Sequence, residues 1–167
     1  RPGVRAFWWP RFGRIARWFI DMEHRRRGKL LSVTAEAKGR LELDGPAGPF
    51  LLTSTADRIE RTADGGLVII DYKTGATPGK AEIMGGYAPQ LALEAVIARA
   101  GGFAGVGPAS TVALAYWKLT GGDPAGMETW PRVDDNMLAT QAFEGLSQMI
   151  ARFDDPATPY HAVPDPA

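Results

Sequence analysis

The most constraining feature of the sequence is a short apolar run, residues 67–70 (Leu-Val-Ile-Ile), which stands between a glycine turn and an acidic residue. The turn is Asp64-Gly65-Gly66, and Asp71 follows the run. A continuous aliphatic segment of this kind, bounded by a turn, is typical of a strand covered on both faces. Residues 50–61 also have strand character, so we expect the two segments to pair as an antiparallel hairpin.

The remaining segments predict helices and strands around that hairpin. Apolar residues at helical spacing predict helices, and alternating apolar residues predict strands. The expected helices cover residues 10–27, 87–100 and 134–153, and the further expected strands cover residues 31–43 and 111–119. The order α-β-β-β-α-β-α indicates an α/β fold in which helices flank a mixed central sheet.

Composition narrows the class of protein. The 167 residues carry 19 Lys+Arg and 19 Asp+Glu, so a uniformly basic nucleic-acid coat is excluded while a local basic patch is not. Cysteine is absent, which excludes disulfides and a cysteine-ligated iron–sulfur cluster. No apolar run approaches the roughly 18 residues of a membrane span, so we expect no membrane contact and a cytoplasmic location. The expected domain covers residues 1–155, and the Pro-rich residues 156–167 lead out of it.

The predicted hairpin brings two acidic residues together. Asp57 lies seven residues before Asp64, and Asp71 lies seven residues after it. Residues equidistant from the centre of a hairpin face each other, with Cβ atoms about 4.5–5.5 Å apart. Lys73 points to the same face because side chains alternate along a strand. A slip of one residue would break this arrangement.

Facing carboxylates repel each other unless a positive charge lies between them. Asp oxygens suit hard cations, and Mg²⁺ binds one or two carboxylates while it keeps several waters. The main-chain carbonyl of Tyr72 is a further candidate ligand, and Lys73 would orient the attacking water. The alternative is a solvated Asp71–Lys73 ion pair. The metal site gains support because Asp71 ends a buried strand, where an unpaired charge is costly.

Further charged residues lie on the first helix and the first strand. Glu23 and Glu36 are candidate auxiliary acids, although Glu23 is also spaced to pair with Arg26 or Arg27. Arg25, Arg26 and Arg27 crowd the last turn of the helix. They form either a solvated helix end that suits the helix dipole or a contact to DNA phosphates.

Several motifs carry a family resemblance. Residues 56–59 (Ala-Asp-Arg-Ile) and 70–75 (Ile-Asp-Tyr-Lys-Thr-Gly) resemble the second and third motifs of RecB-type nucleases of the PD-(D/E)xK superfamily. Residues 89–95 (Pro-Gln-Leu-Ala-Leu-Glu-Ala) resemble the helix motif that follows them. Residues 8–12, 23–26 and 116–119 are similar to the AddB subunits of alphaproteobacterial AddAB helicase–nucleases. The resemblance covers most of the chain, about residues 8–164.

The resemblance implies a restriction-endonuclease-like fold and an Mg²⁺-dependent DNA nuclease, an exonuclease, with Mn²⁺ as an alternative cation. Such domains pair with a helicase–nuclease partner subunit (AddA-like) and resect double-strand breaks for recombinational repair. By resemblance, Asp57 and Asp71 are metal ligands, Lys73 is the catalytic lysine, and Gln90 lies near the metal and the DNA strand. The alternative is a non-catalytic module that keeps the nuclease fold for DNA clamping or subunit docking.

Two departures from the family pattern stand out. The family's glutamine motif usually has Tyr four residues later, where this sequence has Glu94. The family's first motif, a helix with a His or Glu ligand, has no match in residues 1–167. We therefore expect that motif upstream of Arg1, and we expect residues 1–167 alone to bind Mg²⁺ weakly and to cut DNA poorly.

Overall fold

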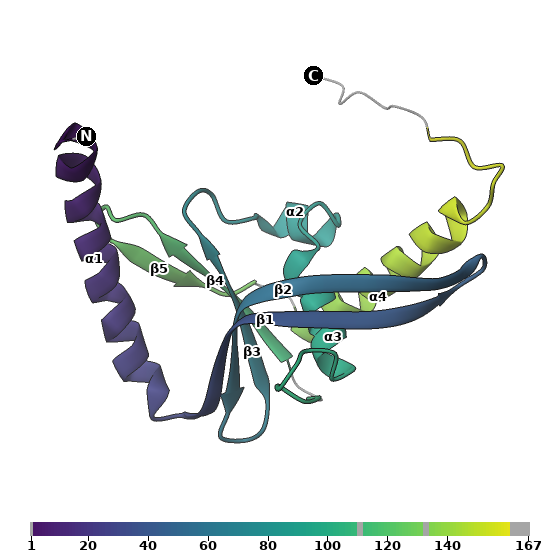
Figure 1. Cartoon of the computed structure of the whole chain (residues 1–167), viewed down its shortest axis with the longest axis horizontal. Coiled ribbons are helices and arrows are strands. Elements are labelled where there is room, and N and C mark those ends of the chain that lie inside the picture. The colour runs from purple at the N-terminus through teal and green to yellow at the C-terminus, as the bar shows by residue number, and fades with distance from the viewer. Residues whose placement is uncertain (1, 110–111, 132–133, 161–167) are drawn as a thin grey trace.

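The structure is a computed structural model that describes residues 2–109, 112–131 and 134–160. Along the described chain, one helix is followed by three strands, two helices, two strands and a last helix (Figure 1). The helices are α1 (Pro2–Arg27), α2 (Lys80–Met84), α3 (Gln90–Arg99) and α4 (Asp135–Phe153). The strands are β1 (Leu30–Gly45), β2 (Gly48–Thr62), β3 (Leu67–Lys73), β4 (Val112–Leu119) and β5 (Gly126–Thr129).

The strands form one mixed sheet in the order β1-β2-β3-β4-β5. β1, β2 and β3 pair antiparallel, β3 and β4 pair parallel, and β5 returns antiparallel to β4. The parallel step needs a crossover connection, which α2 and α3 supply. The predicted α/β fold with a mixed central sheet is therefore confirmed.

Helices cover both faces of this sheet. α3 and α4 lie on one face, where the core includes Ile69, Leu91 and Leu114. α1 lies on the other face, where Met22 and Trp18 pack with Ile70 and Trp117 of the sheet. Because successive side chains of β3 alternate between these two cores, its aliphatic run is buried from both sides, as its composition predicts.

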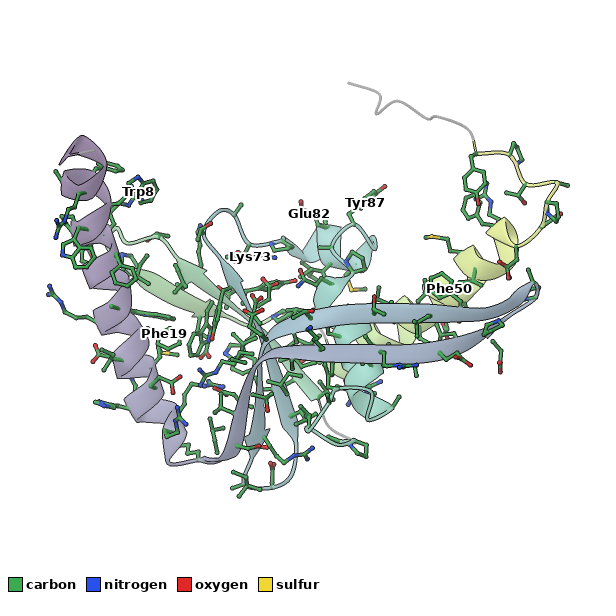
Figure 2. The ribbon with its side chains drawn as sticks, in the orientation of Figure 1. Trp8, Phe19, Phe50, Lys73, Glu82 and Tyr87 are labelled. Atoms are coloured by element: carbon green, nitrogen blue, oxygen red, sulfur yellow. The ribbon has the colours of Figure 1, made fainter. Side chains whose placement is uncertain are left out.

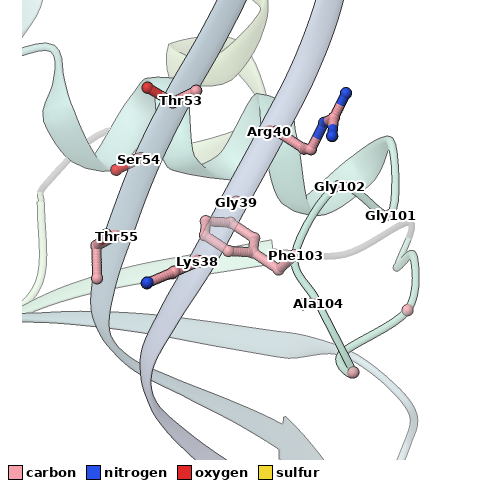
Figure 3. Close-up of a pocket in the computed structure, with 12 residues that line it drawn as sticks. Lys38, Gly39, Arg40, Thr53, Ser54, Thr55, Gly101, Gly102, Phe103 and Ala104 are labelled. Atoms are coloured by element: carbon pink, nitrogen blue, oxygen red, sulfur yellow. The ribbon is translucent and has the colours of Figure 1, made fainter.

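β1 and β2 continue beyond β3 as a long hairpin arm that reaches α4 (Figure 1). At its tip, the backbone N–H of Ala47 donates to Asp154 Oδ2 at 3.0 Å. Figure 3 shows a pocket along the outer edge of this arm, where the ring of Phe103 lies against Gly39. A Cβ atom at Gly39 would lie 2.5 Å from that ring, so only glycine admits this contact.

Three element predictions need correction. α1 begins at Pro2 rather than at Pro10, and Pro10 lies inside the helix at the cost of one backbone hydrogen bond. α3 begins at Gln90, because the preceding residue Pro89 occupies the N-cap position. The short elements α2 and β5 were not predicted, since four or five residues carry too little periodicity to predict them. Within the described parts of the chain, no helix is long and apolar enough to cross a membrane.

Candidate active site

The carboxylates of Asp57 and Asp71 lie at the end of the β2–β3 ladder. The ladder pairs Arg58 with Ile70 and Glu60 with Val68, which is the register that a turn centred on Asp64 predicts. One further step along this register places Asp57 opposite Asp71. The Tyr72 backbone N–H donates to Asp57 Oδ2 at 2.7 Å, so this carboxylate closes the end of the ladder.

Asp71 is held at the edge of the core by Lys73. Its side chain is buried, and the ammonium of Lys73 lies 2.8 Å from Oδ2 and 3.1 Å from Oδ1. Burial raises the pKa of Asp71, the negative charge of Asp57 adds to this, and the Lys73 ammonium opposes it. The lysine extends from the end of β3 (Figure 2), with its side chain 31% exposed. It is therefore open to an incoming substrate.

Gln90, the first residue of α3, joins this group from the crossover connection. Its Oε1 accepts a hydrogen bond from Lys73 Nζ at 3.4 Å. Its Nε2 donates to Glu94 Oε1, one helical turn later, at 3.3 Å. The structure thus brings together all four residues that the motifs predict as catalytic.

Glu94 is a member of the site that the sequence analysis missed. Its side chain is fully buried, and its Oε1 accepts a hydrogen bond from Ser54 Oγ at 2.8 Å. Burial raises the pKa of Glu94 to about 7, and the negative charges of Asp71 and Asp57 contribute to the rise. One sequence feature could have indicated this role: Glu94 is an acidic residue four positions after Gln90, on a helix whose other buried residues are apolar.

The two auxiliary acids lie elsewhere. Glu23 belongs to α1 and forms ion pairs with Arg58 at 2.5 Å and Arg27 at 2.9 Å. Burial favours a higher pKa for Glu23, but the guanidiniums of Arg58 and Arg27 lower the pKa below its ordinary value. Glu36 is an exposed residue of β1 with a left-handed backbone, φ 49°. Neither carboxylate contacts Asp71 or Lys73 in the described structure, so the interpretation of either as an auxiliary acid gains no support.

The arginines of the α1 terminus are not equivalent. Arg26 forms ion pairs with the buried carboxylate of Glu60 and, at 2.8 Å, with Glu128. Its charge is neutralised inside the protein, which argues against the interpretation of Arg26 as a phosphate contact. Arg25 and Arg27 remain exposed at the helix end.

Comparison with known proteins identifies the fold family. The sequence model of the PD-(D/E)XK nuclease superfamily matches residues 4–165. The chain belongs to this superfamily. The assignment of the fold therefore rests on residues 4–165 rather than on the short motifs alone.

Relatives of this superfamily member occur in Rickettsia. An uncharacterized protein of Rickettsia bellii is 29% identical over 134 residues, which cover 72% of this chain and 16% of that protein. Protein RC0550 of Rickettsia conorii is 33% identical over 100 residues, 60% of this chain and 12% of that protein. The chain thus spans less than a fifth of these relatives. The crystal structure of SSO0001 matches with TM-score 0.40 and 16% identity, covering 76% of this chain and 55% of that one.

The donor groups of this superfamily member suit a hard divalent cation. Asp71 Oδ2 is buried and accepts no hydrogen bond from the described residues, although the Lys73 ammonium is close. In the described residues, no cluster of three or more His, Cys, Asp or Glu side chains is arranged to hold a metal. Mg²⁺ commonly binds through one or two carboxylates and keeps its remaining waters. Asp57, Asp71 and the Tyr72 carbonyl fit that demand.

Proposed function

We propose that this chain is a divalent-metal-dependent deoxyribonuclease domain, an exonuclease that hydrolyses DNA phosphodiesters. The observation that supports it is the convergence of Asp57, Asp71 and Lys73 at the end of one strand pair, with Gln90 bonded to the lysine. Two carboxylates and one ammonium on one sheet face supply groups for a cation and for the negative charge of a phosphate.

The roles of the residues follow from their chemistry. Asp57, Asp71 and the Tyr72 carbonyl would hold Mg²⁺, or Mn²⁺ in its place. When bound, such a cation lowers the pKa of a water and offsets charge on the reacting phosphate. Lys73 donates hydrogen bonds toward the attacking water and the phosphate oxygens, while its contact with Asp71 keeps it in place. Gln90 restrains the lysine from the other side.

DNA would also contact exposed basic groups away from the site, at the other end of the β2–β3 ladder, where Lys29, just after α1, accepts a hydrogen bond from the backbone of Ala63. Arg25 and Arg27 are the exposed arginines at the end of α1, and we propose them as contacts to backbone phosphates. Gln90 is exposed beside Lys73 and would lie along the same strand. We do not propose Arg26 as a phosphate contact, because Glu60 and Glu128 neutralise its charge.

We further propose that the domain belongs to a helicase–nuclease of the AddAB kind, as its AddB-like subunit beside an AddA-like partner. The resemblance of residues 8–12, 23–26 and 116–119 supports this assignment. The small share of the rickettsial relatives that the chain covers accords with a domain of a larger protein. The biological role would then be resection of double-strand breaks in the cytoplasm.

A non-catalytic module for DNA clamping or subunit docking is the second candidate. It is favoured by the absence, in the described residues, of a three-ligand cluster for a metal. Cleavage itself separates the two candidates, because a clamp binds DNA without consuming it.

The test is Mg²⁺-dependent cleavage of single-stranded DNA by the full-length protein and its variants. Asp71→Ala is expected to lower the rate at least about 10³-fold, which corresponds to about 4 kcal/mol in the activation barrier. Lys73→Ala is expected to lower turnover while calorimetry still detects Mg²⁺ binding, because an ammonium is not a metal ligand. Glu144→Ala, an exposed residue of α4, is the control. Full cleavage by Asp71→Ala would refute the assignment.

A further inference from the structure

A chain of hydrogen bonds links β2 to β3 through the first turn of α3. Ser54 Oγ donates to Glu94 Oε1 at 2.8 Å, and Gln90 Nε2 donates to the same oxygen at 3.3 Å. Lys73 Nζ donates to Gln90 Oε1 at 3.4 Å and to Asp71 Oδ1 at 3.1 Å. The hydrogen bonds therefore connect β2, α3 and β3, and they lead from the fully buried carboxylate of Glu94 to the exposed ammonium of Lys73.

We propose that Glu94 is a positioning residue, which fixes the orientation of the Gln90 amide and through it the ammonium of Lys73. The proposal deepens the proposed nuclease function, because it rests on the role assigned there to Lys73. Glu94 itself does not touch the substrate, since its side chain is fully buried.

The chemistry of the amide group explains why a carboxylate is needed. A glutamine side chain has one accepting end and one donating end, whereas Glu94 Oε1 accepts in both of its hydrogen bonds. Glu94 therefore requires Gln90 to present Nε2 inward, which leaves Oε1 for Lys73. If the amide turned over, its NH₂ group would face the ammonium, and both contacts of Gln90 would be lost.

Glu94 is itself held in one position. It lies on α3 one turn after Gln90, where side chains at i and i+4 are neighbours. Ser54 of β2 donates a hydrogen bond to the same oxygen that accepts from Gln90. Glu94 is thus fixed by its own helix, α3, and by Ser54 of the sheet.

Packing alone does not account for a charged residue at this position. Glu94 Oε2 is buried and accepts no hydrogen bond among the described residues, and burial raises the pKa of this carboxyl. An apolar side chain of similar volume would fill the space with no buried charge to stabilise. The buried carboxylate lowers the stability of the folded protein. It also accepts a hydrogen bond from Gln90, which an apolar residue cannot do.

The test compares two substitutions of Glu94 with a matched control. Glu94→Leu fills the space without an acceptor, and Glu94→Gln keeps an oxygen that can accept from Gln90 Nε2. Glu82→Gln removes a carboxylate from the exposed helix α2 nearby (Figure 2) and is the control. A double-mutant cycle with Gln90→Ala separates a positioning role from a general loss of folded protein.

We expect Glu94→Leu to lower kcat about 10-fold at unchanged KM, the size of one lost hydrogen bond in the transition state. Glu94→Gln should stay within about 3-fold of the wild type, and Glu82→Gln should match it. In the Gln90→Ala background, Glu94→Leu should change kcat less than about 2-fold. An equal loss in both backgrounds would overturn the proposal.

A second readout does not depend on cleavage. The Gln90 side-chain amide gives its own ¹H–¹⁵N resonances, and we expect Glu94→Leu to shift them and to speed their proton exchange about 10-fold. Glu82→Gln should leave them in place. If the full-length wild-type protein fails to cut DNA, the proposed function fails while this measurement still decides the role of Glu94. Unchanged Gln90 resonances in Glu94→Leu would overturn that role.

Discussion

The two faces of the sheet differ at β2 and β3 in how far their buried charged residues are neutralised by partners of opposite charge. On the α1 side, the charged cluster consists of Glu23, Arg26, Arg58, Glu60 and Glu128. Both arginines of this α1-side cluster are shared between two carboxylates, and Arg58 also lies 5.1 Å from the centre of the Trp117 ring. With Arg27, which also pairs with Glu23, three arginines face the three carboxylates, so the charges neutralise one another.

On the α3 side, the charged cluster consists of Asp57, Asp71, Lys73 and Glu94, with Gln90 between the last two. Three carboxylates share one ammonium, and the described ion pairs of this α3-side cluster are limited to that of Lys73 with Asp71. Burial raises the pKa values of Asp71 and Glu94, whereas the pKa of Glu23 on the α1 side is lowered by its arginines. An excess of carboxylates leaves negative charge that can attract a cation, whereas a balanced network has no charge left for a ligand.

The largest expected effect comes from breaking the α1-side cluster. Arg58→Met leaves the fully buried Glu60 with less compensating charge, and removing one partner of a buried ion pair typically costs about 3–5 kcal/mol. Urea unfolding should show a loss of stability of that size. Arg25→Met, at an exposed position of the same helix, should change stability by less than about 0.5 kcal/mol. A loss below about 1 kcal/mol for Arg58→Met would contradict the structural role.

On the α3 side, neutralising a carboxylate should stabilise the protein instead. The pKa of Glu94 is raised from 4.5 to about 7, so the folded state disfavours the ionised form. Stability is then lost as pH rises from about 4.5 to 7, and Glu94→Gln should gain about 2–3 kcal/mol over the wild type at pH 8.

That gain should vanish below about pH 4.5, where the carboxyl is protonated in both folded and unfolded chains. Urea unfolding in EDTA at pH 4 and pH 8 measures it, with Glu144→Gln as an exposed control. A pH-independent difference between Glu94→Gln and the wild type would show that the buried carboxyl does not titrate as described.

The smallest expected effect is the response of stability to Mg²⁺. A ligand that binds only the folded state at a few times its dissociation constant adds about 1 kcal/mol. We expect this increment in the wild-type chain and its loss in Asp71→Asn. Glu23→Gln, which removes a carboxylate from the α1-side cluster, should keep it. An increment that survives in Asp71→Asn would place the cation elsewhere.

The sequence alone determined the hairpin and the residues at its end. The register of β2 on β3 follows from the position of the glycine turn, because a turn and its flanking strands are close in the chain. Alternation along β3 then places Asp71 and Lys73 on one face, as their ion pair confirms. These relations are local, so residue spacing is enough to predict them.

The tertiary structure decided which distant residues complete each cluster. Glu94 reaches Ser54 only because the crossover places α3 over β2, and Arg26 meets Glu128 only because β5 returns beside β4. The sequence pattern of α1 gave no means to distinguish Arg26 from its neighbours. The partner of a charged side chain on a helix is set by the helix's rotation against the sheet, and that rotation is fixed by packing of the whole core rather than by residue spacing.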